Sequence, residues 1–96
     1  MTREELVERG RRAMHILESD EWREAWNAYR ETLLREIESC SAKDAESVMH
    51  CKRLLSAANA ARVQLERMMT DGIVAAKEIE VFSRRQKVVK NIRNWL

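Results

Sequence analysis

Proline is absent from this chain of 96 residues, glycine occurs only twice, and aromatic residues make up 5% of it. β-Sandwiches and hairpin-rich barrels need turn residues and aromatic side chains, so the composition argues against both. Two cysteines are too few for a disulfide-dense scaffold, and we expect both to be free thiols in a reducing compartment. The remaining composition, 45% hydrophobic, predicts one all-α domain covering residues 1–96.

Long hydrophobic runs are also missing. No stretch approaches the roughly 18 to 20 apolar residues of a membrane span, and the first twelve residues are too charged for a signal peptide. We therefore expect an intracellular protein and no membrane-spanning segment.

Charge is divided unevenly along the chain. Residues 1–46 hold 8 basic and 12 acidic residues, whereas residues 47–96 hold 10 basic and 4 acidic ones. After residue 82 the chain has no acidic residue and five basic ones: Arg84, Arg85, Lys87, Lys90 and Arg93. This asymmetry favours association between copies or binding to an anionic partner.

Capping signals mark the first helices. Thr2 followed by Glu5 is a capping box, which predicts a helix from residue 3 to about 17, with a kink or frayed first half near Gly10. Ser19, followed by two acidic residues, predicts a second helix over residues 20–39. Ser41 and Asp44 form another capping signature, which predicts a third helix over residues 42–69.

The link between the second and third helices is so short that they must form an antiparallel hairpin. Apolar residues recur every three or four positions in both helices, and Trp22 and Trp26 are expected near residues 65–69. At 1.5 Å per residue the third helix is about 42 Å long, while a compact chain of this size is about 32 Å across. The hairpin must therefore protrude, and we expect a homo-oligomer to cover its apolar residues: Trp22, Trp26, Tyr29, Leu33, Ile37, Leu55, Leu65 and Met69.

The segment Thr70-Asp71-Gly72 interrupts the pattern. We expect a bend there, followed by a separate basic C-terminal helix; one uninterrupted helix through Gly72 is the alternative. Three ligands fit such a basic amphipathic helix: nucleic acid, an acidic protein surface, or an anionic membrane, of which the membrane is the least favoured. The cations could instead only complement the helix dipole.

No catalytic, metal or cofactor site is predicted. His15, Cys40, His50 and Cys51 are the only histidines and cysteines, and their spacing matches no metal motif. No glycine-rich phosphate loop and no nucleophile elbow is present. We therefore do not expect an enzyme.

The runs from Trp22 to Glu38 and from Cys51 to Glu66 combine an aromatic-rich first helix with a second helix rich in arginine and leucine. Over residues 20–69 the chain resembles the small helical-hairpin proteins encoded in the structural and morphogenesis gene clusters of tailed phages. The resemblance implies a non-enzymatic part of a virion or of its assembly machinery, located in the virion or the bacterial cytoplasm. No functional residue is carried across by it.

Together these observations predict a self-associating structural or protein-interaction component with a further protein partner. The alternative is a nucleic-acid-binding accessory protein that uses the basic C-terminal residues.

Overall fold

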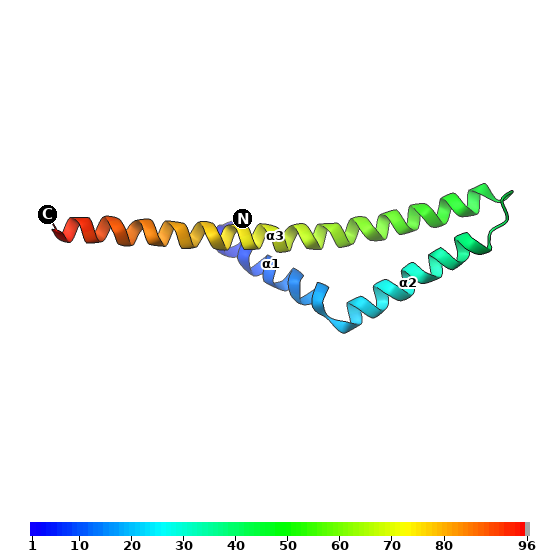
Figure 1. Cartoon of the computed structure of the whole chain (residues 1–96), viewed down its shortest axis with the longest axis horizontal. Helices are drawn as coiled ribbons and strands as arrows, with labels where there is room; N and C mark the ends of the chain where they lie inside the picture. Colours follow the sequence, from blue (N-terminus) through cyan, green and yellow to red (C-terminus); the bar gives the residue numbers. More distant parts are fainter. Residues whose placement is uncertain (96) are drawn as a thin grey trace.

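The computed structural model describes residues 1–95, which form three helices. α1 spans Arg3–Glu18, α2 spans Asp20–Ser39 and α3 spans Ala45–Trp95. α1 and α2 follow one another beside α3 and meet at a corner away from it, while the C-terminal part of α3 extends alone (Figure 1). The structure measures 81 × 24 × 18 Å, so the predicted all-α, elongated hairpin is confirmed.

The predicted starts of α1 and α2 are confirmed by their caps. The Thr2 hydroxyl accepts a hydrogen bond from the Glu5 N–H at 3.1 Å, and the Glu5 carboxylate accepts one from the Thr2 N–H at 3.5 Å. Ser19 both ends α1 and begins α2. Its hydroxyl donates to the Ile16 carbonyl at 2.8 Å and accepts from the Trp22 N–H at 3.2 Å. One extended residue therefore turns the chain between the two helices.

The third helix begins later than predicted, at Ala45 rather than at residue 42. The Asp44 carboxylate caps it by accepting a hydrogen bond from the Ser47 N–H at 3.3 Å. Ser41 lies in the preceding turn, where its hydroxyl accepts from the Lys43 N–H at 3.3 Å. Both residues favour caps, but a carboxylate also interacts with the positive end of the helix dipole.

The expected bend at residues 70–72 is wrong, because α3 continues through Gly72 to Trp95; the alternative of one uninterrupted helix is confirmed. The expected kink or fraying near Gly10 is also wrong. Both glycines are buried, and they face each other where α1 crosses α3. A glycine within a helix costs about 1 kcal/mol relative to alanine. Here close helix packing offsets that cost.

The two backbones almost touch at this crossing. A Cβ atom added to Gly10 would lie 2.8 Å from the Gly72 Cα, and one added to Gly72 would lie 2.9 Å from the Gly10 Cα. Ala13 and Ala75 follow three residues after each glycine and are only 2% and 3% exposed. Each helix thus presents a small residue on two successive turns, which lets the axes approach closely.

Two ion pairs between α1 and α3 accompany the crossing. Arg3 contacts Glu78 at 2.7 Å, and Arg9 contacts Asp71 at 3.6 Å. Along α1 the first of these residues, Arg3, pairs with the later α3 residue, Glu78, and Arg9 pairs with the earlier one, Asp71. The two helices therefore run antiparallel.

The core along this rod is thin. Within residues 1–95 the buried hydrophobic side chains are Ala13, Leu33, Cys51 and Ala75. Most of the larger apolar side chains remain partly or largely exposed. The chain therefore folds with little buried volume of its own.

Candidate interaction surface

The eight apolar residues predicted to mediate association contribute mainly to the hairpin itself. In α2, Leu33 is buried, Trp22, Trp26 and Ile37 are half-buried, and Tyr29 is 43% exposed. In α3 the remaining three are half-buried: Leu55, Leu65 and Met69. Half-buried residues of this kind leave only part of their surface for another copy.

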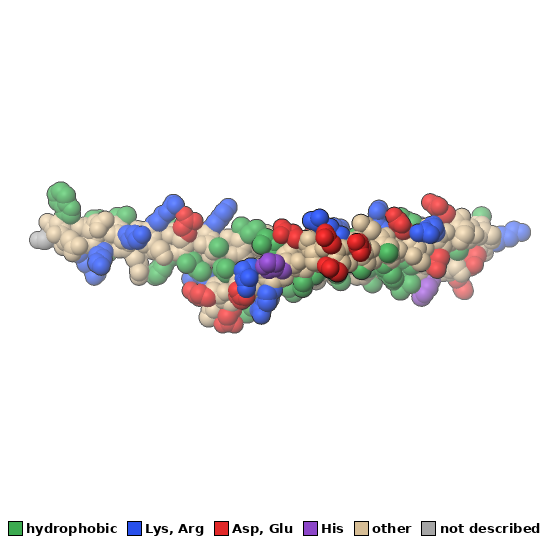
Figure 2. All heavy atoms as spheres, turned by 90° about the horizontal axis from the view of Figure 1, so that it is seen from below, with side chains coloured by type: hydrophobic (Ala, Val, Ile, Leu, Met, Phe, Trp, Pro, Cys, Tyr) green, Lys and Arg blue, Asp and Glu red, His purple; other side chains and the backbone are tan. Residues whose placement is uncertain are grey.

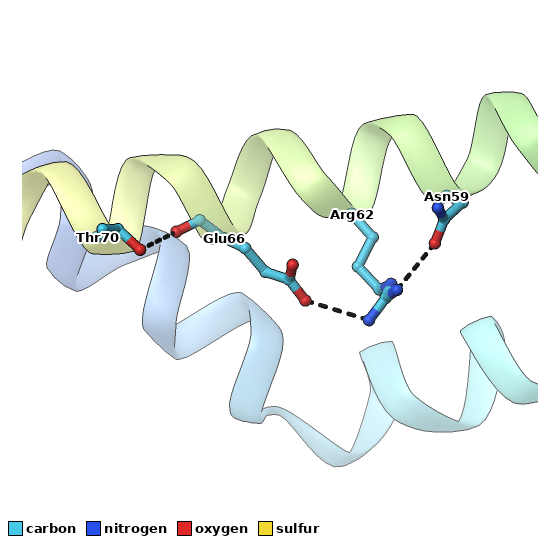
Figure 3. Close-up of polar contacts among 4 residues, drawn as sticks. All are labelled: Asn59, Arg62, Glu66 and Thr70. Carbon is cyan, nitrogen blue, oxygen red and sulfur yellow. Dashed lines mark hydrogen bonds and ion pairs between the residues drawn. The ribbon is translucent and has the colours of Figure 1, made fainter.

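The aromatic end of α2 is fixed by an arginine of α3. Trp22 and Trp26 stack with ring centroids 6.1 Å apart, and the Arg62 guanidinium lies 5.4 Å from the centre of the Trp26 ring. Arg62 also donates to the Asn59 side chain at 2.8 Å and to Glu66 at 3.1 Å (Figure 3). These bonds orient the guanidinium along α3 and hold it in place for a cation–π contact.

The linked end of the hairpin contains the two cysteines, and both are free thiols. The Cys51 thiol is buried and donates a hydrogen bond to the Glu36 carboxylate, with a sulfur–oxygen distance of 3.3 Å. Burial raises the pKa of Cys51, and the hydrogen bond to Glu36 raises it further. A thiol held in its protonated form is a weak nucleophile.

The basic residues predicted to bind a partner lie on the last part of α3. We call residues 80–95 the terminal segment, and every residue in it is exposed. Arg84 forms an ion pair with Glu80. Within the described chain the other four cations form no ion pair: Arg85, Lys87, Lys90 and Arg93. Near the C-terminal tip, Figure 2 shows blue and green side chains but no red ones.

The terminal segment is also rich in exposed apolar side chains. Phe82 is 60% exposed and Trp95 is 91% exposed. Four more apolar side chains of the segment are between 46% and 57% exposed: Val81, Val88, Val89 and Ile92. α1 covers none of them, because its first residue, Arg3, already pairs with Glu78. The segment is thus a bare amphipathic helix.

One row of side chains continues from the crossing to the end of α3. Its members are separated alternately by four and three residues, the spacing of a coiled-coil seam. We call this row the α3 strip, and it comprises Val74, Glu78, Val81, Arg85, Val88, Ile92 and Trp95.

Two shallow grooves follow the α3 strip. One, of about 380 Å³, is lined by its first four members together with Phe82, Lys77 and Arg3. The other, of about 440 Å³, is lined by Val88, Ile92 and Trp95 with Asn91. Sequence reasoning identified the cations of this region but missed the row as a whole. Its alternating spacing was the available signal, and the two charged members obscured it.

Neither a metal-binding cluster nor a membrane-spanning helix is found within residues 1–95. No group of three or more histidine, cysteine, aspartate or glutamate side chains within residues 1–95 could hold a metal ion. In the same range, no helix combines the length and apolar character needed to cross a bilayer. No protein-family model, curated protein or solved structure matches the chain.

Proposed function

We propose that this chain is a non-enzymatic, self-associating structural or protein-interaction component. The observation that carries the proposal is the terminal segment, a fully exposed helix with apolar side chains along its length. An isolated helix of this length is marginally stable in water, and most helices in proteins are stabilised by packing of an apolar face. A second protein surface would supply that packing.

Self-association is favoured because the same chain carries surfaces of opposite charge. α2 holds six acidic and three basic residues, whereas the terminal segment holds five basic residues and one acidic residue. Copies of the chain can therefore attract one another. The setting that we propose is a phage virion or its assembly machinery, for which the support is the resemblance of residues 20–69.

Size-exclusion chromatography with light scattering tests the proposal directly. At micromolar concentration we expect a mass of at least twice the 11.3 kDa of one chain. The apolar face of the terminal segment would be buried in that assembly, so the mass should persist at high salt better than a purely electrostatic complex. A single species of 11.3 kDa across the concentration range would contradict self-association.

A second candidate function is binding to nucleic acid, which the cations without ion pairs in the terminal segment support. Such binding would weaken linearly in logarithmic plots of affinity against salt, with a slope of about 0.9 per phosphate contacted on duplex DNA. Replacing Lys87 and Lys90 by alanine should reduce the slope by about 2 if both contact phosphates. Affinity that is insensitive to salt would contradict this candidate.

A further inference from the structure

The α3 strip combines two properties that together select a partner. Five of its seven members are apolar, and its spacing is that of a helix facing another helix. The remaining two, Glu78 and Arg85, have opposite charges and are separated by seven residues. A partner helix must cover the apolar members and also provide a counter-charge beside each of these two.

Both charged members have free capacity for such a contact. Arg85 forms no ion pair within the described residues, whereas its neighbour Arg84 is paired with Glu80. Glu78 is paired with Arg3, but its side chain is still 51% exposed, and a carboxylate can accept bonds from two arginines. Neither residue is enclosed by α1 or α2.

A parallel copy of α3 is a poor partner. In register, it would place Arg85 against Arg85 and Glu78 against Glu78 at the centre of an apolar contact, where like charges repel strongly. It would also place the two cationic ends side by side, each with four unpaired cations.

An antiparallel copy removes both conflicts. When the two-fold axis passes between Val81 and Phe82, Glu78 lies opposite the partner's Arg85, and the same pair forms again on the other side of the axis. Val81 then lies within one residue's rise of the partner's Val81, and Val74 lies within one residue's rise of the partner's Val88. The two Lys90 side chains would be about 25 Å apart along the axis, well beyond the screening length of about 8 Å at physiological salt.

We infer that the α3 strip is the site at which a second copy of this chain docks, with the two α3 helices antiparallel about an axis between Val81 and Phe82. This inference rests on the proposed self-association and names its partner surface. A two-fold contact of this kind uses the same patch on both copies and closes on itself.

Charge reversal tests the pairing. Glu78→Arg and Arg85→Glu should each shift the mass measured by light scattering toward one chain, because each creates two like-charged contacts at the centre of the interface. The double variant E78R/R85E should restore the mass, since the opposite charges again meet. Circular dichroism of each variant shows whether the helices still form.

Two control variants separate the interface from other effects. Lys90→Glu makes the same change in net charge as Arg85→Glu, but its position lies outside the α3 strip, so the mass should be retained. Arg3→Ala removes the intramolecular partner of Glu78 and should also leave the mass unchanged.

Cross-linking tests the orientation independently. In a background without the native cysteines, Val81→Cys should form a disulfide-linked dimer under mild oxidation, because the two positions lie beside the axis. Ile92→Cys should not, since its two copies would be about 30 Å apart. Both original side chains are about half exposed, at 46% and 55%, so neither change opens a cavity in the monomer.

The outcomes distinguish the two proposals. A wild-type mass of 11.3 kDa at all concentrations would overturn self-association and the docking site together. An oligomer that ignores both charge reversals, or that cross-links through residue 92 and not through residue 81, would overturn the antiparallel site and leave self-association standing. Assembly that requires added nucleic acid would likewise overturn the site.

Discussion

The first part of α3, residues 45–79, and the terminal segment belong to one continuous helix but have opposite surroundings. In the first part, small residues admit α1 to within backbone contact, and half-buried leucine and methionine residues pack in the hairpin. In the terminal segment no side chain is buried, although six of its residues are large and apolar. The boundary between the two parts of α3 lies where α1 begins, because the first residue of α1, Arg3, pairs with Glu78.

The difference shows that the apolar side chains of α3 are packed within the chain in one part and left exposed in the other. Helix propensity alone sustains neither part, because helices in proteins are stabilised mainly by packing of an apolar face. The first part obtains that packing within the chain. Under the self-association that we propose, the terminal segment obtains it from a second copy, and substitutions in the two parts should therefore affect different measurements.

The largest expected contrast is between Leu33→Ala and Ile92→Ala. Leu33 is 4% exposed, so its truncation should lower the free energy of unfolding by about 2 to 5 kcal/mol. Ile92 is 55% exposed, so its truncation should change the stability of one chain by less than about 0.5 kcal/mol while reducing the mass of the assembly. In a Trp95→Phe background, tryptophan fluorescence in urea reports on the hairpin alone. Equal effects of the two truncations on unfolding would contradict the contrast.

A smaller effect is expected at the crossing of α1 and α3. Gly72→Ala would stabilise an exposed helix by about 1 kcal/mol, but here the added methyl group would lie 2.9 Å from the Gly10 Cα and 3.0 Å from the Leu6 carbonyl. We expect a net destabilisation of about 1 to 3 kcal/mol, as for other overpacked sites. Thermal unfolding followed by circular dichroism measures it.

Ala75 and Ala76 provide a matched control for that prediction. Ala75 is 3% exposed against α1, whereas Ala76 beside it is exposed. Replacing the first by valine should destabilise the chain by overpacking, and replacing the second should change the unfolding temperature little. If Gly72→Ala raised the unfolding temperature and Ala75→Val left it unchanged, the close approach of α1 and α3 would be refuted.

Much of the fold could be predicted because its signals are local. The Thr2–Glu5 capping box and the Ser19 cap act within one turn of their own helices, and both helix starts follow from them. The continuity of α3 could not be predicted in the same way. Gly72 is tolerated because Gly10, 62 positions earlier, packs against it, and a single sequence does not reveal that pairing.

Only part of the candidate site could be predicted from the sequence. The cations after residue 82 stand out in the composition, and the structure places them on an exposed helix. The α3 strip was missed because Glu78 and Arg85 interrupt its apolar residues.

The smallest expected effect concerns Cys51, at the linked end of the hairpin and far from both contrasted regions. Burial and the bond to Glu36 raise the pKa of its thiol in the folded chain. The unfolded chain therefore releases this proton at lower pH than the folded chain. The stabilising contribution of the protonated thiol is thus complete below the ordinary thiol pKa of about 8.5 and declines as the pH rises through the pKa of the folded chain.

Urea unfolding of the wild type and of Cys51→Ala between pH 7 and pH 10 isolates this loss of stability, because lysine and tyrosine titrate alike in both proteins. We expect the stability difference between the two proteins to shrink above pH 8.5, with Cys40→Ala, whose half-buried thiol forms no bond to Glu36, as the control. Parallel stability curves for the wild type and Cys51→Ala would show that the thiol titrates equally in both states.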